Sequence, residues 1–458
     1  MISKAWRYAL KNFWLGTIIF LFLVTRLYKI SEVPGSVYWD EASIGYNAFA
    51  ISTDLKDEWG EFLPLHFRAF GEFKLPVYIY SVAILTKLFG SSEFTLRLPS
   101  VLYSLGIIII VYFLTLKISK DEKIGLLSSF LLSISPWFFI FSRTGYEATA
   151  GLFFFFLATY LFLLVDKNKY YIISSAFSFI LSFYSYNSFR IIIPVWAITL
   201  LIYKFGFVRK YFIVSLISLL LFLLSLIPVY RLYKYDSGGA RFAQVEIKSK
   251  TDFVKNYISH FSPDFLFLKG DTNPRSQIPG HGQLYLFEFP LLLLGLMVIL
   301  RSKKFEFFLP LILLLLAPIP AALTRESPHA LRSLLAAPSF AIISALGVNF
   351  LSENIKRFGK IIILIAVTAY CLSFESYAMD FFNKYSMETA SAWQREYKDI
   401  FTMQKSGIVT DKYAQPYIFA LYYQKYDPQK FRSTVKYNPV DKWGFSLVSS
   451  FGDYKFNK

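Results

Sequence analysis

Long apolar runs with few charges are the feature that most limits what this chain can fold into. Runs at 107–113, 151–165 and 213–227 lie in longer charge-free segments, long enough or nearly so to cross the roughly 30 Å hydrocarbon core of a bilayer. Hydrophobic residues make up 55% of the 458 residues, charged residues 17%, and the mean hydropathy is +0.45. Because a soluble helix is rarely apolar on every face, the sequence predicts an all-α polytopic membrane protein.

The apolar runs predict about eleven transmembrane helices. A further apolar run at 75–88 has only about fourteen residues and contains Pro76 and Lys87, so it predicts an interfacial helix instead. The predicted spans are 12–29, 97–117, 124–141, 148–165, 170–185, 190–204, 211–230, 285–300, 307–323, 333–350 and 360–378.

Basic residues divide unevenly between the predicted loops, and this asymmetry predicts the orientation. One set of loops carries clusters at 117–123, 167–169, 204–210, 301–304 and 356–360. The short opposite loops carry only Arg143, Arg190, Arg325 and Arg332. By the positive-inside rule, we expect a multi-pass plasma-membrane protein with a cytoplasmic N-terminus and the C-terminal domain outside. The net charge of +17 then reflects membrane anchoring, and nucleic acid is not an expected partner.

This orientation divides the chain into a transmembrane domain, 1–378, and a non-cytoplasmic C-terminal domain, 379–458. The transmembrane domain has a first outside loop at 30–96 and a second large outside loop at 231–283. In the C-terminal domain, the pattern predicts a small α/β appendage. Its predicted elements are helices at 390–404 and 415–424 and strands at 407–410 and 445–449.

Two adjacent carboxylates follow the first predicted span. Asp40 and Glu41 lead into 42–52, which has the spacing of a helix with one apolar side. Spacing alone favours solvated loop acids, with Asp40 capping the helix. The functional alternative is that one of them acts as a general base at the level of the lipid headgroups.

The order of motifs in the first outside loop resembles the signature of glycosyltransferase family 39. The Asp-Glu pair is followed by Gly71-Glu72-Phe73-Lys74-Leu75-Pro76, then by Phe89-Gly90 and by Arg97-Leu98-Pro99-Ser100. That family includes protein O-mannosyltransferases and resembles the lipid A aminoarabinose transferases, all of the GT-C type. Beyond the third span, the Arg143 to Glu147 segment fits the resemblance, although many relatives have Asp where Glu147 stands.

The resemblance implies an inverting transferase that takes a sugar from a polyprenyl-phosphate donor and passes it to an acceptor hydroxyl on the non-cytoplasmic face. Asp40 would be the general base, and Glu41 would orient Asp40 or the acceptor. Lys74 and Arg143 would bind the donor phosphate. Glu147 and Glu72 would support that site or organise a metal ion. The sequence has no Gly-rich nucleotide fingerprint, which agrees with a donor dissolved in the bilayer.

All four histidines fall in predicted outside segments, so a divalent metal stays open as a cofactor. None has the spacing of a known metal motif, and no cofactor is certain. His329 and Arg332 would contact the donor phosphate if they face a cavity. The alternative is that both simply lie at the membrane interface.

Two other functions fit parts of the pattern. A transporter or flippase of a lipid-linked or anionic solute would also have many spans, but it would place binding charges near the middle of the bilayer. A cell-surface glycan polymerase or ligase would share the lipid donor. The predicted partners are the polyprenyl-phosphate sugar, membrane lipids and an acceptor that is a lipid, a protein or a glycan.

The predicted orientation can be tested by labelling single cysteines in intact cells. A cysteine at Ser237 or Ser386 should react with an impermeant thiol reagent, whereas a cysteine at Asn168 should not, because Asn168 lies in a basic loop. Labelling of the cysteine at position 168 alone would contradict the predicted orientation and indicate the opposite one.

Overall fold

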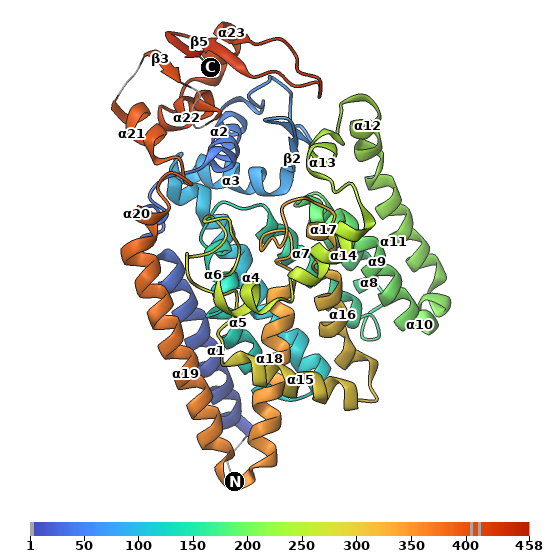
Figure 1. The fold of residues 1–458 in the computed structure, drawn as a ribbon. Coiled ribbons are helices and arrows are strands. Elements are labelled where there is room, and N and C mark those ends of the chain that lie inside the picture. The colour runs from blue at the N-terminus through green and yellow to red at the C-terminus, as the bar shows by residue number, and fades with distance from the viewer. Residues whose placement is uncertain (1–3, 404–405, 411–413, 458) are drawn as a thin grey trace.

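The chain folds into a bundle of helices that carries loops and a small sheet at one end. The computed structural model describes residues 4–403, 406–410 and 414–457. The first loop, the second loop and the C-terminal segment gather at one end, which we call the loop end, and α1 begins at the other (Figure 1). The side of the membrane that each end faces stays a prediction.

The bundle is built from helices that match the predicted apolar runs. Their bounds are α1 (Lys4–Leu27), α4 (Glu93–Ser119), α5 (Glu122–Ser133), α6 (Pro136–Phe141), α7 (Ala148–Leu163), α8 (Tyr171–Phe183), α9 (Asn187–Tyr203), α10 (Phe205–Lys210), α11 (Phe212–Ser225), α12 (Ile227–Tyr235), α15 (Glu288–Arg301), η2 (Phe305–Phe308), α16 (Leu309–Leu316), α17 (Ile319–Ala322), α18 (Ala336–Asn354), η3 (Lys356–Phe358) and α19 (Gly359–Asp380).

Five helical runs in the described part of the chain are long and apolar enough to cross a membrane. They are Glu93–Ser119, Phe212–Tyr235, Phe305–Ala322, Ala336–Asn354 and Gly359–Glu388. Shorter apolar helices include Ala148–Leu163 and Tyr171–Phe183. These helices confirm a multi-pass membrane protein, while the predicted number of eleven spans stays a prediction.

One predicted span is broken in the structure. The run at 124–141 forms two helices, α5 and α6, because Pro136 lacks a backbone N–H and fits only at the start of a new helix. Ser135 is the N-cap of α6, and the end of α6 leads into the short loop that carries Arg143 and Glu147, before α7.

The first loop forms the helices that the sequence predicts. It contains α2 (Trp39–Asp54), the hairpin of β1 (Phe67–Arg68) and β2 (Phe73–Lys74), and α3 (Pro76–Phe89). Gly71 has a φ of +76°, a conformation that favours glycine, and it makes the tight turn of the hairpin. Because β2 ends at Lys74 and α3 begins at Pro76, the hairpin fixes the position of Lys74.

The second loop lies beside the loop that precedes α18. It contains α13 (Ala240–Val245), α14 (Lys250–Ser259) and η1 (Asp264–Leu268). Glu246 forms an antiparallel bridge with Thr324, which joins these two loops.

The C-terminal segment has the mixed α/β character that the sequence predicts. Its elements are η4 (Phe381–Tyr385), α20 (Ser386–Glu388), α21 (Arg395–Met403), β3 (Gly407–Thr410), α22 (Pro416–Tyr423), α23 (Pro428–Thr434), β4 (Lys436–Tyr437), β5 (Val448–Phe451) and β6 (Tyr454–Asn457). The sheet order is β3-β6-β5-β4, with β3 and β6 parallel and the other pairs antiparallel.

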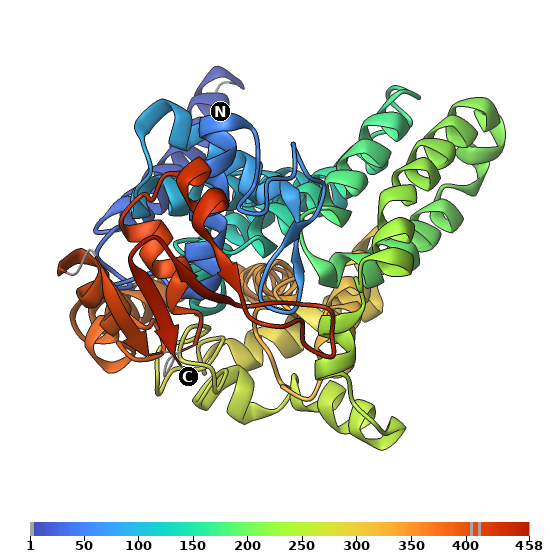
Figure 2. The same cartoon turned by 90° about the horizontal axis from the view of Figure 1, so that it is seen from above.

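This C-terminal segment shares a hydrophobic core with the first loop. Helix α22 packs against α2, and their buried residues, including Ile44 and Phe419, belong to one cluster. The segment lies over the first loop when the molecule is seen from above (Figure 2). The division into domains at residue 379 stays a prediction, but the segment is packed onto the first loop rather than tethered to it.

Candidate functional site

Three charged side chains of the first loop form a cluster at the loop end. The Lys74 Nζ atom lies 2.5 Å from an Asp40 carboxylate oxygen and 3.0 Å from a Glu72 oxygen. The Lys74 side chain is 3% exposed, whereas those of Asp40 and Glu72 are 26% and 24% exposed. The carboxylates therefore face accessible space, and the ammonium group lies beneath them.

Local structure accounts for this placement. Asp40 lies in the first turn of α2, where the helix dipole stabilises a negative charge. Lys74 is the last residue of β2 and pairs with Phe67 of β1. Burial alone would lower the pKa of Lys74, but the carboxylates of Asp40 and Glu72 raise it above its ordinary value. Lys74 is thus held as a cation.

Glu147 joins this cluster from the N-terminus of α7. It is half-buried, and the backbone N–H of Leu75 donates a hydrogen bond to its carboxyl group. Its Oε1 atom is buried without a hydrogen-bond partner. Burial, opposed by the charge of Lys74, raises the pKa of Glu147 to about 7, and Asp40 and Glu72 add to the rise. The structure therefore brings Glu147 together with the predicted residues Asp40, Glu72 and Lys74.

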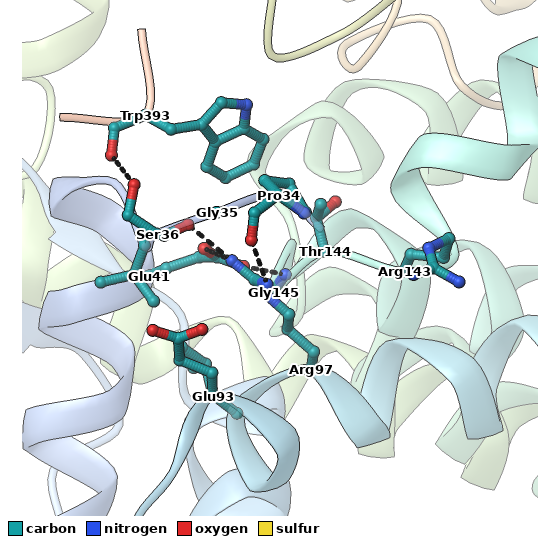
Figure 3. Close-up of polar contacts among 12 residues, drawn as sticks. Pro34, Gly35, Ser36, Glu41, Glu93, Arg97, Arg143, Thr144, Gly145 and Trp393 are labelled. Atoms are coloured by element: carbon teal, nitrogen blue, oxygen red, sulfur yellow. Dashed lines mark hydrogen bonds and ion pairs between the residues drawn. The ribbon is translucent and has the colours of Figure 1, made fainter. Parts of the chain in front are cut away.

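Glu41 points away from this cluster and into the protein. It forms a fully buried ion pair with Arg97, with both side chains 0% exposed. The Nε and Nη2 groups of Arg97 donate to the two Glu41 oxygens at 3.1 Å, and the Gly145 N–H donates to Oε1 at 2.6 Å. The remaining Arg97 donors bind the carbonyls of Ile30, Pro34 and Ser36 (Figure 3). This geometry favours a structural role for Glu41, as the tie between the first loop and α4.

Arg143 also has partners that favour a structural role. Its Nη groups donate to the backbone carbonyls of Thr25, Arg26 and Tyr28 at 2.5, 2.9 and 2.8 Å. These carbonyls lie at the C-terminal end of α1, where a cation is favourable. The structure gives Arg143 no contact with Lys74 among the described residues, so we do not carry it forward as a phosphate-binding residue.

Arg332 lies close enough to His329 and to Tyr186 to influence the pKa of each, and Glu147 also influences that of Tyr186. Arg332 donates to the Thr324 hydroxyl at 2.8 Å. Burial raises the pKa of Tyr186 to about 12, with Arg332 and Glu147 close enough to influence it. Burial lowers the pKa of His329 well below its ordinary value, and neighbouring arginines add to the effect. His329 is therefore neutral, and of these two predicted residues only Arg332 brings a positive charge.

A small cavity lies between Arg332 and the start of α7. It is lined by Ala148, Tyr186, Ser188, Phe189, Ile192, Leu331, Arg332, Leu334 and Leu335. The cavity has room for about one water molecule, so it does not by itself make a phosphate site, and phosphate contact by Arg332 stays a prediction.

Two further cations of this region were missed in the sequence. Arg241 lies 3.6 Å from the second oxygen of Glu72, and Arg275 lies close enough to Asp40 to interact with it electrostatically. Both come from the second loop, more than 160 residues after Lys74 along the chain. No local motif marks them, so only the folded arrangement reveals them.

The donor set does not by itself define a metal site. In the described residues, no three or more His, Cys, Asp or Glu side chains are gathered so that they could hold a metal ion. Within the carboxylate cluster, Asp40 and Glu72 are already paired with Lys74. The unpartnered oxygen of Glu147 is one ligand only. We therefore derive no step through a metal ion.

A family model matches part of the chain. The model described as dolichyl-phosphate-mannose-protein mannosyltransferase matches residues 74–233, a range that begins at Lys74 and includes Glu147. No curated protein sequence matches the chain.

Solved structures share the fold. ArnT from Cupriavidus metallidurans, solved bound to undecaprenyl phosphate, has a TM-score of 0.57 at 13% identity, over 90% of this chain and 75% of ArnT. The archaeal oligosaccharyltransferase AglB from Archaeoglobus fulgidus, in complex with an inhibitory peptide and a dolichol-phosphate, has a TM-score of 0.52 at 15% identity. That match covers 87% of this chain and 58% of AglB. At these identities the matches show a shared fold, and together with the family model over residues 74–233 they support the prediction of a GT-C type membrane glycosyltransferase.

The buried position of Glu41 makes a prediction about stability. Glu41→Gln should lower the free energy of unfolding by about 3–5 kcal/mol, because it leaves the buried charge of Arg97 without its counterion. The measurement is thermal unfolding of the purified protein, with Glu61→Gln as a control because Glu61 is an exposed acid of the same loop. Equal melting temperatures for the two variants would contradict the structural role.

Proposed function

We propose that this protein moves a sugar from a polyprenyl-phosphate donor to an acceptor hydroxyl at the loop end, with inversion at the anomeric carbon. The observation that carries the proposal is the cluster of Asp40, Glu72 and Glu147 around the buried ammonium group of Lys74. A carboxylate and a cation side by side are the two groups that this reaction needs.

Lys74 is the proposed phosphate-binding residue. As the polyprenyl phosphate departs, negative charge grows on its oxygen atoms, and a fixed cation stabilises that charge. Lys74 lies at the start of α3, the predicted interfacial helix, which would place it at the level of lipid headgroups. Arg332 would supply a second positive charge, because both it and Glu147 lie close enough to Tyr186 to influence its pKa.

Asp40 is the proposed general base. The acceptor oxygen forms a bond to the anomeric carbon, the bond from that carbon to the phosphate oxygen breaks, and the acceptor proton passes to Asp40. The lipid phosphate leaves with the electron pair of the broken bond. Glu72 and Glu147 support Lys74 electrostatically, and Glu147 holds the start of α3 through the N–H of Leu75.

The side of the membrane that the loop end faces is part of this proposal. With a cytoplasmic N-terminus, the loop end faces the non-cytoplasmic side of the plasma membrane, so the acceptor is met there. Acceptors of that compartment include lipids, proteins and glycans. ArnT was solved with a polyprenyl phosphate and AglB with a dolichol-phosphate, which supports a lipid-phosphate donor for this chain.

The test of this function uses a panel of polyprenyl-phosphate sugars. The purified full-length protein, incubated with the panel and with membranes as the source of acceptor, should release free polyprenyl phosphate from at least one donor. Movement of an intact donor across liposome membranes without release of polyprenyl phosphate would instead favour the flippase alternative.

Asp40→Asn tests the general base. We expect turnover to fall by about 10²- to 10⁴-fold, because Asn keeps the shape and an oxygen acceptor for Lys74 but cannot take the proton. Yield should stay normal and the melting temperature should fall only slightly, since Glu72 remains as a counterion of Lys74 and Asp40 does not cap α2, whose N-cap is Tyr38.

Asp252→Asn is the matched control for this substitution. Asp252 is also in the first turn of a helix, α14, and is exposed. It should keep its turnover. Near-normal sugar transfer by a folded Asp40→Asn protein would contradict the assignment of Asp40 as the base.

A further inference from the structure

Arg275 stands on a tightly ordered turn of the second loop. The backbone N–H of Asn273 donates to Asp271 at 2.8 Å, and the backbone N–H of Arg275 donates to the Asn273 side chain at 3.0 Å. The other Asp271 oxygen accepts from the Ala330 N–H at 2.7 Å, and the Pro274 carbonyl accepts from the Tyr385 hydroxyl at 2.7 Å. The turn is thus fixed by two neighbouring segments.

The Arg275 side chain reaches the residues just before Asp40. Its guanidinium carbon lies 5.0 Å from the ring centroid of Tyr38 and 5.6 Å from that of Trp39, which are cation–π distances. One Nη group donates to the Ala392 carbonyl of the C-terminal segment at 3.1 Å. Three segments of the chain therefore hold this guanidinium beside the proposed base.

Arg275 differs from the other cations of the site in its charge partners. Lys74 and Arg241 both pair with Glu72, and Arg332 lies 3.3 Å from Glu326. No ion pair joins Arg275 to an acid within the residues that the structure describes, and the bond to Ala392 is its one side-chain hydrogen bond there. A half-buried guanidinium with unused donors is suited to bind an anion from outside the chain.

The donor and the acceptor of the proposed reaction would each need a cation at a different place in the site. The donor phosphate has Lys74, at the start of the predicted interfacial helix, as its proposed cation. Arg275 lies in contact with the second loop and the C-terminal segment, which the proposed orientation places on the aqueous side. An anion bound there would lie next to Asp40, where the acceptor hydroxyl must be deprotonated.

We propose that Arg275 binds an anionic group of the acceptor, a carboxylate or a phosphate close to the hydroxyl that receives the sugar. This inference rests on the proposed function and narrows its acceptor to an anionic class. The planar guanidinium, fixed by the rings of Tyr38 and Trp39, would hold the anion through its remaining N–H groups.

The experiment compares two probes that differ in one charge. Octyl glucuronide and octyl glucoside, both below their micelle-forming concentrations, are tested as inhibitors of sugar transfer to acceptors in membranes. Octyl glucuronide should inhibit the unaltered protein about tenfold or more strongly than octyl glucoside, as expected for a charge-assisted hydrogen bond. Arg275→Gln should abolish this difference, and Arg275→Lys should retain part of it. Equal inhibition by the two probes, or a preference that survives in Arg275→Gln, would overturn the proposal.

A second arm separates the acceptor from the donor. The KM for the polyprenyl-phosphate sugar should stay unchanged in Arg275→Gln, whereas a KM raised for the donor alone would assign Arg275 to the donor phosphate and overturn the proposal. Lys269→Gln is the matched control, because Lys269 is an exposed cation of the same loop and should change neither value. Failure of the unaltered protein to release polyprenyl phosphate would instead contradict the proposed function itself.

Discussion

The buried ion pair of Glu41 and Arg97 is the interaction on which the loop end depends. A buried charge is tolerated only where hydrogen bonds and a counterion compensate for the lost water. Arg97 donates five hydrogen bonds, two to the carboxylate of Glu41 and three to backbone carbonyls. Those acceptors come from the start of the first loop and from α2, while Gly145 adds the segment before α7. One guanidinium thus fixes the first loop onto α4.

This pair also separates the roles of two neighbouring acids. Successive residues of an α-helix point about 100° apart, so Asp40 and Glu41 cannot face the same surroundings. With Glu41 directed at Arg97, Asp40 is turned toward Lys74 and accessible space. The sequence shows an acidic pair, whereas the structure shows one acid that fixes the loop and one that is available for chemistry.

Whether a feature of the site could be predicted from the sequence depends on how far apart along the chain its interacting residues lie. Helices α2 and α3 lie within one loop, and the spacing of its apolar residues predicts both. The motif order assigns Asp40 and Lys74 to one site but does not predict the ion pair between them. Arg143 shows the limit of such reasoning, because its proximity to a loop suggests phosphate binding but its partners are carbonyls at the end of α1. Arg275 could not be found in this way, since its neighbours come from residues 38–40 and 392.

The position of the C-terminal segment also depends on contacts between residues far apart in the sequence, and these contacts help to hold the site. Patterns of local sequence predict its helices and strands, but they do not show that its apolar residues complete the core of α2 and α3. The Trp393 carbonyl accepts from the Ser36 hydroxyl at 2.6 Å, and the Gln394 side chain accepts from the Trp39 N–H at 3.0 Å. The residues before Asp40 are therefore held by Arg97 on the membrane side and by the C-terminal segment on the other. In the proposed reaction, a carboxylate fixed from both sides would keep its place while a lipid donor and an acceptor enter, which is the pre-organisation that a transfer between two substrates requires.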